Sequence, residues 1–195
     1  MATQYDAIAE RYRDSKDSPV RRYVERPTIL GLAGDVRGMR VLDLACGDGH
    51  YTRELARRGA NIAAVDTDEA GLAELRREVA ALNRRCSIHT LDVSSRQRMQ
   101  ALPREVLAEH GAVHILVNNA GVSVNLRFLE QQVEDLEWIT GINYWGVMYG
   151  CKFFLPHLLA ADEAHIVNIS SSAGFTGMKW QSSYSATKFA VTGLS

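Results

Sequence analysis

Short strand-like runs alternate with helical patterns along most of the chain. The strand-like runs cover residues 40–44, 60–65, 87–91, 113–117 and 165–169. Between them, apolar residues recur with helical spacing over residues 51–58, 69–82, 96–110 and 133–159. Strands joined by helical crossovers pair in parallel, and right-handed crossovers place helices on both faces of the sheet. The sequence therefore predicts an α/β fold, a doubly wound Rossmann-type parallel sheet in three α/β/α layers.

The first 38 residues lie outside this alternation. Apolar residues recur at loosely helical spacing over residues 5–32, which predicts two short amphipathic helices that separate near Pro19. We therefore expect a helical N-terminal segment, 1–38, followed by one Rossmann-type domain, 39–195, that is large enough to bury its own core. Within that domain, Pro103 should kink or divide the third helical pattern.

Composition restricts the partners and the compartment. With 46% hydrophobic residues, 23% charged residues and a net charge of −1, the chain lacks the basic excess of a nucleic-acid-binding protein, so a small molecule is the expected partner. The three cysteines are far apart, which argues against a disulfide framework, and they show no metal-ligand spacing with histidines. Met1 opens into polar residues without a signal peptide, and the longest apolar stretch, 145–161, is too short to span a bilayer. We expect a cytoplasmic protein with no membrane partner and no metal.

Tyr184 and Lys188 lie four residues apart in a helical pattern near the C-terminus. Residues at this spacing share one helix face, so the phenol and the ammonium should project into the same volume. A phenol has a pKa near ~10 in water, and a nearby cation lowers that pKa toward neutrality, so that Tyr184 could act as a general acid or base. Ser171 follows the last strand-like run, where α/β sheets bind ligands. A carbonyl or carbinol oxygen could therefore bridge the two hydroxyls.

Four stretches, taken in order, resemble the short-chain dehydrogenase/reductase family. They are Asn118-Asn119-Ala120-Gly121, Asn143, Ile169-Ser170-Ser171-Ser172-Ala173-Gly174 and Tyr184-x-x-x-Lys188. The resemblance covers residues 56–195 and implies a secondary alcohol or ketone as substrate, with hydride transfer to or from a nicotinamide cofactor. It also implies that the family's chain continues beyond Ser195, and that the 133–159 helix and the Tyr184 helix pair in homo-oligomers.

The resemblance assigns roles to the matching residues. Tyr184 would be the general acid or base, beside Ser171, and Lys188 would bind the nicotinamide ribose and lower the pKa of Tyr184. Asn143 would hold a water that relays protons to the lysine. The cofactor-binding positions that it implies after the fourth strand are Asn118, Ala120 and Gly121. Asn118 would lie near the cofactor ribose, although a purely structural role for its amide is the alternative.

The loop after the first strand points to a different cofactor. Dehydrogenases of the resembled family carry three glycines here, which let a diphosphate approach a helix N-terminus, whereas this chain has only Gly47 and Gly49. Residues 41–49 instead resemble the first motif of class I S-adenosylmethionine-dependent methyltransferases, and the N-terminal segment resembles the lid of some of them. Asp43 and Asp48 suit an ammonium and a sulfonium better than a diphosphate. Alternatively, the two glycines only make a tight strand-to-helix turn.

Acidic residues that follow the next two strands suit an adenosine. Asp66 can accept hydrogen bonds from both ribose hydroxyls, and its charge disfavours a 2′-phosphate, so among nicotinamides it indicates NAD rather than NADP. By resemblance to either family, Asp92 and Val93 would hold the adenine edge. Either acid could instead serve as a helix N-cap.

Three hypotheses are therefore open. The leading hypothesis is an NAD-dependent oxidoreductase with the catalytic residues Asn143, Ser171, Tyr184 and Lys188. The second is a methyltransferase that binds S-adenosylmethionine at Asp43, Gly47 and Gly49. The third is an inactive chimera, methyltransferase-like over 1–55 and dehydrogenase-like over 56–195, that binds an adenosine-containing ligand weakly or not at all.

Overall fold

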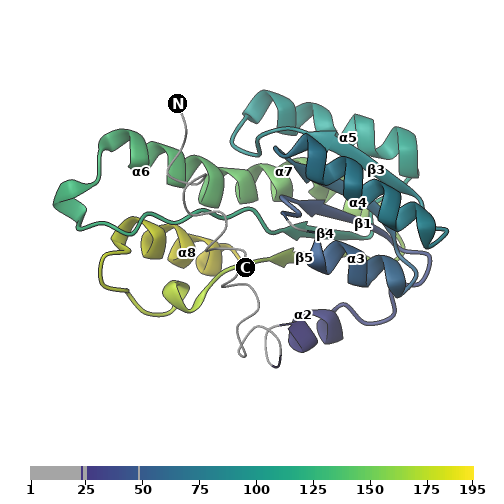
Figure 1. Ribbon diagram of the computed structural model, residues 1–195, viewed down its shortest axis with the longest axis horizontal. Helices are drawn as coiled ribbons and strands as arrows, with labels where there is room; N and C mark the ends of the chain where they lie inside the picture. Colours follow the sequence, from purple (N-terminus) through teal and green to yellow (C-terminus); the bar gives the residue numbers. More distant parts are fainter. Residues whose placement is uncertain (1–22, 24–25, 48) are drawn as a thin grey trace.

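Five parallel strands form one sheet at the centre of the molecule (Figure 1). The computed structural model describes residues 23, 26–47 and 49–195. The strands are β1 Arg40–Leu44, β2 Asn61–Asp66, β3 Cys86–Thr90, β4 Ile115–Asn118 and β5 His165–Asn168. Their order is β3-β2-β1-β4-β5, and every neighbouring pair is parallel. The predicted α/β fold is confirmed, and each of these strands lies within two residues of its predicted bounds.

The register of the sheet aligns the carboxyl ends of the strands. Leu44 at the end of β1 pairs with Val65 on one side and with Asn118 on the other, and Asn118 pairs with Asn168. The chain winds outward in opposite directions from β1, through β2 and β3 on one side and through β4 and β5 on the other. Such a reversal point opens a crevice at the carboxyl edge, which is where open α/β sheets bind their ligands.

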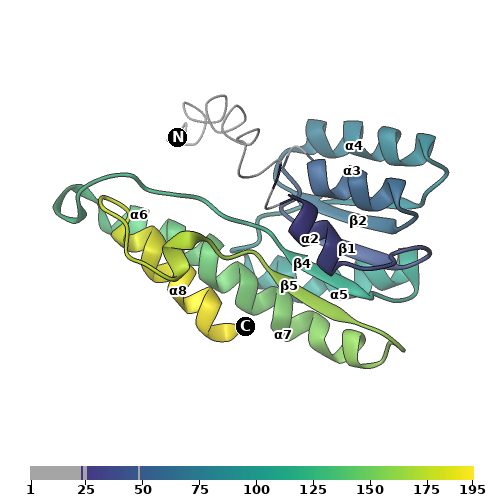
Figure 2. The same ribbon diagram turned by 90° about the horizontal axis from the view of Figure 1, so that it is seen from below.

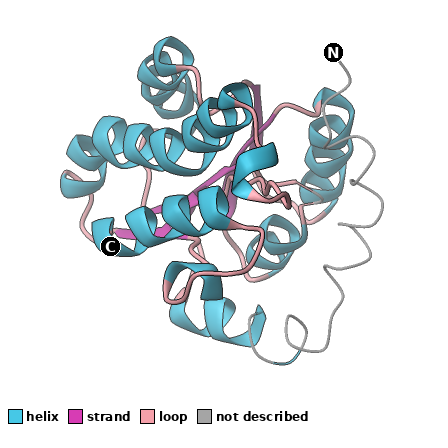
Figure 3. Cartoon of the chain, turned by 90° about the vertical axis from the view of Figure 1, so that its left-hand side faces the viewer, coloured by secondary structure: helices cyan, strands magenta, loops and turns pink. Residues whose placement is uncertain are grey.

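Helices cover both faces of the sheet (Figure 2). The helices on the first face are α2 Arg26–Leu32, α3 His50–Arg57 and α4 Glu69–Ala81, and those on the second face are α5 Arg96–His110 and α7 Gly146–Leu159. A view from the end of the molecule shows the same arrangement, with the strands between the two layers of helices (Figure 3). The predicted three-layer architecture is therefore observed.

Each face of the sheet has its own hydrophobic cluster, because successive side chains of a strand point to opposite faces. On the first face, Val41 packs in one cluster with Leu72 of α4. On the second face, Leu42 packs with Met99 of α5 and Phe154 of α7. Leu42, Met99 and Phe154 are completely buried. The sheet is therefore clamped from both sides, which fixes the position of its carboxyl edge.

The predicted helix over residues 133–159 is observed with a wider turn at its centre. It consists of α6 Val133–Thr140, the π-helical turn η3 Gly141–Trp145, and α7, which begins at Gly146. A π turn shifts the backbone bonding from i−4 to i−5, and such turns occur frequently at functional sites. Asn143 lies in the middle of this turn.

The last part of the chain packs beside α6, beyond the end of the sheet (Figure 1). Its elements are the 3₁₀ turn η4 Ser172–Gly174 and the helix α8 Ser182–Leu194, while another 3₁₀ turn, η2 Phe128–Glu130, precedes α6. Both α6 and η4 contact α8, which carries Tyr184 and Lys188. The two residues of the predicted pair therefore lie at the junction between the sheet and this group of helices.

Two expectations about the helices need correction or fall outside the structure. Pro103 does not divide α5, which is one helix of 15 residues. Proline cannot donate a hydrogen bond to the carbonyl of Met99, but burial of Met99, Leu102 and Val106 against the sheet holds the helix together across that gap.

The two predicted N-terminal helices fall largely on residues outside the described part of the chain, and α2 covers only the end of that prediction. Among the described helices, none combines the length and hydropathy that a bilayer-spanning segment needs.

Candidate active site

The Lys188 amine is buried between α8 and the segment that follows β5. The residue is 3% exposed, and its Nζ atom donates a 2.7 Å hydrogen bond to the backbone oxygen of Ile169. Nζ also lies 5.9 Å from the ring centroid of Tyr184, one helical turn earlier. Burial lowers the pKa of Lys188 to about 8, because water no longer stabilises the ammonium. The amine and the phenol ring thus lie on one face of α8, as their spacing predicts.

The Asn143 side chain ties the loop after β4 to α8. Asn143 is completely buried, and its Oδ1 accepts a 2.8 Å hydrogen bond from the backbone N–H of Val122. Its Nδ2 donates to the backbone oxygen of Val122 at 2.9 Å and to Oγ1 of Thr187 at 3.1 Å. Thr187 in turn donates a 2.8 Å bond to the backbone oxygen of Tyr184. The amide of Asn143 is therefore committed to positioning, and its role in a proton relay stays a prediction.

Gly121 lies directly against the buried amine. A Cβ atom at this position would be 3.4 Å from Nζ of Lys188 and 3.9 Å from Oδ1 of Asn143. The preceding residue, Ala120, is buried at 5% exposure. The structure therefore brings three predicted site residues together, and the glycine allows the backbone to approach the amine.

Ser171 lies at the carboxyl edge, three residues after β5, as predicted. It is the N-cap of η4, and its Oγ atom accepts a 3.2 Å hydrogen bond from the N–H of Ala173. The neighbouring Ser170 hydroxyl donates to the backbone oxygen of Lys188 at 3.1 Å, which fastens this segment to α8. Gly174 makes the close packing possible, because a Cβ atom there would lie 2.8 Å from the same oxygen.

The two asparagines after β4 have structural contacts. Asn118 is 2% exposed, and its Nδ2 donates to Oδ1 of Asn168 at 2.7 Å and to Sγ of Cys151 at 3.3 Å. Asn119 donates a 2.6 Å bond to the backbone oxygen of Ala45, so it holds the first loop against β4. The Asn118 side chain thus ties β4 to β5 and α7, in keeping with the structural alternative, and its predicted proximity to a cofactor ribose stays a prediction.

Backbone donors of the first loop are engaged within the protein. The N–H groups of residues 45 and 46 both donate to the backbone oxygen of Val65, that of Gly47 donates to Oδ2 of Asp66 at 2.8 Å, and that of Gly49 donates to the oxygen of residue 46. Gly47 and Gly49 have φ values of 56° and 70°, which glycine adopts without strain. Both make the tight turn that the sequence suggested as an alternative. Asp48 lies outside the described residues.

Asp43 belongs to the interior rather than to the crevice. It is 1% exposed, and its Oδ2 accepts a 2.6 Å hydrogen bond from the hydroxyl of Thr52 on α3. The carboxylate therefore links β1 to α3. This buried position does not favour the predicted role of Asp43 as a cofactor ligand.

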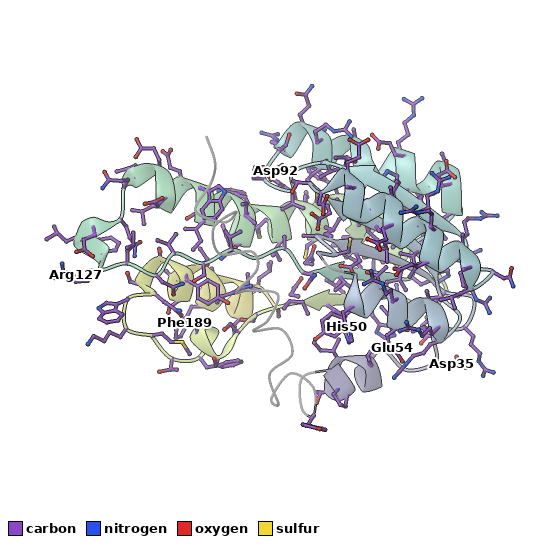
Figure 4. All side chains as sticks on the ribbon, viewed as in Figure 1. Asp35, His50, Glu54, Asp92, Arg127 and Phe189 are labelled. Carbon is purple, nitrogen blue, oxygen red and sulfur yellow. The ribbon has the colours of Figure 1, made fainter. Side chains whose placement is uncertain are left out.

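Asp66 and Asp92 shape the turns that follow their strands. Oδ1 of Asp66 accepts from the N–H groups of Thr67 and of residue 68, while its Oδ2 takes the Gly47 donor. Asp92, which is exposed near the start of α5, accepts a 2.8 Å bond from the N–H of Ser94 (Figure 4). The N-caps of the two following helices are other residues, Asp68 and Ser95. Both predicted adenosine ligands therefore lie at the carboxyl edge.

The described residues fit the two ends of a dinucleotide better than its middle. At one end, the half-buried Asp66 carboxylate lies at the sheet edge and retains an acceptor site on Oδ2 for a ribose hydroxyl. At the other end, the Lys188 amine beside Gly121 could donate a hydrogen bond to a hydroxyl of the nicotinamide ribose. In the described part of the loop, however, each N–H group already has a protein acceptor, so a diphosphate would have to displace one of them. Within the described residues no group of side chains is arranged to hold a metal ion.

A cavity of about 510 Å³ lies behind this site, between α6 and α8. Its lining includes Phe128, Leu136 and Tyr144 on one side and Ala186 and Ala190 on the other. Neither Ser171, Tyr184 nor Lys188 contributes to the lining, so this cavity is distinct from the predicted catalytic group.

Two positioning residues were not among the predicted site residues. Thr187 joins Asn143 to Tyr184, and the backbone of Val122 holds the Asn143 amide. The sequence does contain one signal for Thr187, namely a hydroxyl residue three positions after Tyr184, where it can bond back to that residue's carbonyl. The role of Val122 depends on a backbone contact across 21 residues, for which sequence has no local signal.

Comparison with known proteins gives a consistent result. A family model described as short chain dehydrogenase matches residues 47–195. The protein SadH of Mycobacterium tuberculosis is 40% identical over 140 residues, which are 72% of this chain and 51% of SadH. The 2,3-dihydroxy-2,3-dihydro-p-cumate dehydrogenase of Pseudomonas putida is 35% identical over 137 residues, 70% of this chain and 53% of that protein. The chain thus spans about half the length of these curated relatives.

Solved structures show the same likeness. A short chain dehydrogenase/reductase of Burkholderia phymatum in complex with NAD has a TM-score of 0.78 and 32% identity, covering 82% of this chain and 58% of that one. A short chain dehydrogenase of Mycobacterium paratuberculosis bound to NAD has a TM-score of 0.78 and 28% identity, covering 83% and 66%. Since 82% of 195 residues is about 160, the likeness of fold includes residues before position 56.

Proposed function

The chain belongs to the short-chain dehydrogenase family, and from this premise we propose that it carries the catalytic group of an NAD-dependent oxidoreductase that interconverts a secondary alcohol and a ketone. Members of this family are oxidoreductases that act on small molecules. The observation that carries the proposal is the Lys188 amine, 3% exposed and one helical turn from the Tyr184 ring. Burying an amine costs folding free energy, and ionisable groups with strongly shifted pKa values cluster at functional sites.

Each catalytic residue has a distinct task in this proposal. A bound nicotinamide would supply or take up the hydride. Tyr184 gives its phenolic proton to the substrate oxygen during reduction and takes the proton back during oxidation. The Lys188 ammonium stabilises the phenolate that is left, and Ser171 donates a hydrogen bond to the substrate oxygen. With a pKa of about 8, Lys188 is still mostly protonated at pH 7, as this role requires.

The position of Asp66 supports NAD over NADP in this proposal. Its carboxylate lies at the end of β2 and already fixes the first loop through Gly47. A 2′-phosphate brought to the same place would meet this negative charge, whereas a ribose hydroxyl could donate to the remaining acceptor site. A higher affinity for NAD than for NADP is therefore expected.

Parallel titrations test the proposal against its competitors. Thermal unfolding is measured with increasing NADH, NADPH and S-adenosylmethionine, and saturable stabilisation by NADH is expected because a ligand that binds only the folded state raises its stability. Stabilisation by S-adenosylmethionine alone would refute the proposal and favour the methyltransferase. The absence of any shift would favour an inactive chain.

Exchange of Tyr184 for phenylalanine tests the catalytic assignment separately. The variant should bind NADH as the wild type does but should not oxidise it in the presence of a ketone. Tyr23 offers a control, since Tyr23→Phe removes a phenol hydroxyl at a position that is 71% exposed and should change neither property. Turnover by the Tyr184→Phe variant would show that another group moves the proton.

The methyltransferase resemblance concerns the first loop and the residues before it. We keep the chimera over residues 1–55 as a proposal, supported by the engaged N–H groups of the first loop, which leave little for a diphosphate. A loop of this kind predicts weaker NAD binding than a loop with three glycines. Replacing residues 45–49, which follow β1, with a three-glycine loop should therefore tighten NADH binding in the same titration, and unchanged affinity would contradict the chimera.

We also propose that the chain forms homo-oligomers through α7 and α8. Trp145, Tyr149 and Phe153 stack along one side of the η3–α7 helix, with ring centroids 5.6 and 5.8 Å apart. Phe189 of α8 is 46% exposed and Leu159 of α7 is 77% exposed, and exposed apolar groups of this size are typical of interfaces (Figure 4). Light scattering after gel filtration should give a multiple of 21.6 kDa, and a monomer mass would contradict the proposal.

A further inference from the structure

A second cluster of ionisable side chains lies between β3 and α5. Ser87 and His89 are two residues apart on β3, so both point toward α5, where Glu105 and His110 meet them. Oγ of Ser87 lies 3.0 Å from Nε2 of His89 and 2.9 Å from Nε2 of His110. Nδ1 of His89 lies 3.3 Å from Oε2 of Glu105. Ser87 and His89 are each 9% exposed and His110 is 4% exposed, so the chain of hydrogen bonds runs through the protein interior.

The hydrogens of this chain can be assigned from the acceptors. The Glu105 carboxylate only accepts, so Nδ1 of His89 carries a hydrogen. When His89 is neutral its Nε2 is an acceptor, which must receive the hydroxyl hydrogen of Ser87. Nε2 of His110 must then donate to the Ser87 oxygen. Three hydrogens thus make three hydrogen bonds, and Nδ1 of His110 is buried with no hydrogen-bond partner.

The chain has no place for an additional proton. A proton on Nδ1 of His110 would be a buried N–H group without an acceptor, which costs free energy. A proton on Nε2 of His89 turns that acceptor into a donor, so the Ser87 hydroxyl must donate to Nε2 of His110 instead, and the hydrogen of His110 moves to Nδ1, where it has no acceptor. Either way, protonation leaves a buried N–H group of His110 without a partner, which favours separation of β3 from α5 so that water can reach this group.

Charges around the cluster reinforce this conclusion. Burial is the main cause that lowers the pKa of His110, and Arg85 lowers it further; Glu109 opposes this effect, while His89 and Arg40 add smaller contributions in the lowering direction. On the other side, Arg98 lies 3.6 Å from Glu105 and shares that carboxylate with His89. The folded state therefore binds its proton on His110 less readily than the unfolded chain does, so folding stability falls as the pH falls below the ordinary histidine pKa of 6.5.

The cluster of Ser87, His89, Glu105 and His110, here called the clamp, connects β3 and α5, the two elements that flank one loop. The loop between β3 and α5 contains Asp92 and Val93, and Leu91 at its start donates a hydrogen bond to the backbone oxygen of Asp66. Val93 packs against Gly146 of α7, where a Cβ atom would lie 2.8 Å from its Cγ2 atom. The loop is thus held to β2 and to α7, and it continues directly into β3 on one side and into α5 on the other.

We propose that Ser87, His89, Glu105 and His110 are positioning residues for the adenosine-binding loop at Asp92 and Val93, and that an added proton releases this loop and weakens cofactor binding. The proposal rests on the proposed function for the identity of the ligand. It differs from a merely structural role of the cluster because it couples the protonation of the cluster to affinity at the carboxyl edge.

The test is the pH dependence of NAD⁺ affinity, measured by calorimetry at pH 7.5 and pH 5.5. Because the free protein takes up a proton more readily than the complex, NAD⁺ affinity should fall about threefold from pH 7.5 to pH 5.5. His110→Gln keeps a donor nitrogen toward Ser87 but cannot titrate, so it should retain the affinity at pH 7.5 and lose this weakening. His165→Gln is the control, because His165 is exposed at the start of β5 and should leave the wild-type pH dependence in place.

Hydrogen exchange of the ligand-free protein tests the clamp on its own. After correction for intrinsic rates, the amides of β3 and α5 should exchange faster at pH 5.5 than at pH 7.5 in the wild type, and His110→Gln should abolish the difference. Equal pH dependence of NAD⁺ affinity in the wild type and His110→Gln would overturn the proposal. No NAD⁺ binding at pH 7.5 would instead overturn the proposed function and the loop coupling with it, while the exchange data would still decide whether the clamp responds to protons.

Discussion

Replacing Lys188 with methionine should stabilise the chain at neutral pH and stabilise it less as the pH rises. The amine is 3% exposed, and burial lowers its pKa from 10.5 to about 8. Between these two values the unfolded chain is protonated while the folded chain is not, so the stability of the wild type increases with pH. Methionine has a similar length and carries no charge, so its burial carries no such dependence.

The magnitude follows from the two pKa values. With 10.5 for the unfolded chain and about 8 for the folded chain, linkage gives a cost of about 3 kcal/mol at pH 7 and of about 1 kcal/mol at pH 10. The advantage of Lys188→Met should therefore shrink by about 2 kcal/mol between these conditions. The lost hydrogen bond to the oxygen of Ile169 reduces the advantage at both pH values by about 1 kcal/mol without removing the trend.

Urea unfolding of the wild type and Lys188→Met at pH 7, 8.5 and 10 measures this difference. Other titrating groups are shared by the two proteins and cancel in the comparison. Lys152→Met, which removes an exposed lysine of α7, controls for the loss of one positive charge. A difference between the wild type and Lys188→Met that stays constant from pH 7 to pH 10 would refute the reasoning, because the amine would then titrate as it does in water.

Three further predictions concern the contacts around this amine. Thr187→Val removes one of the two acceptors of the buried Asn143 amide and should cost about 1–3 kcal/mol of unfolding free energy in urea, whereas Thr187→Ser should retain most of the stability; equal losses in both variants would contradict the role of the hydroxyl. Gly174→Ala should destabilise by about 1–3 kcal/mol, because its Cβ atom would press on a backbone oxygen of α8, while Gly177→Ala in the same loop has open space and should be nearly neutral. Asp66→Asn should weaken NADH binding and narrow the preference for NADH over NADPH in a fluorescence titration, and an unchanged preference would show that this carboxylate does not read the ribose.

The parts of the fold that depend on local pattern could be predicted from the sequence. Buried strands form continuous apolar runs, and the helices between them repeat with a period near 3.6, so the sheet and its layers follow from residue order alone. The Tyr184–Lys188 pair could be predicted for the same reason, because spacing on one helix is local. The bond from Lys188 to Ile169 could not, since it joins an amine to a backbone oxygen 19 residues away and depends on how η4 packs on α8.

The π turn at η3 shows a second kind of limit. Widening one turn hardly changes the spacing of the apolar residues over 133–159, so the sequence pattern still reads as one regular helix. The sequence shows one sign of this turn, namely the polar Asn143 within an apolar helical pattern. The structure buries this side chain completely, and a buried polar side chain needs hydrogen-bond partners. Those partners, Val122 and Thr187, come from two other segments and emerge only when the chain is folded.

Among the described residues, neither hydrophobic cluster of the sheet includes any residue of α8. Polar bonds fasten this helix to the segment after β5 through Ser170 and Lys188, and to Asn143 of η3 through Thr187. Sheet and helix can therefore be gained or lost in separate steps, since apolar burial holds the first together and directional bonds hold the second. During folding, the sheet would then form first, and α8 with Tyr184 and Lys188 would reach the carboxyl edge of the sheet only in the last docking step.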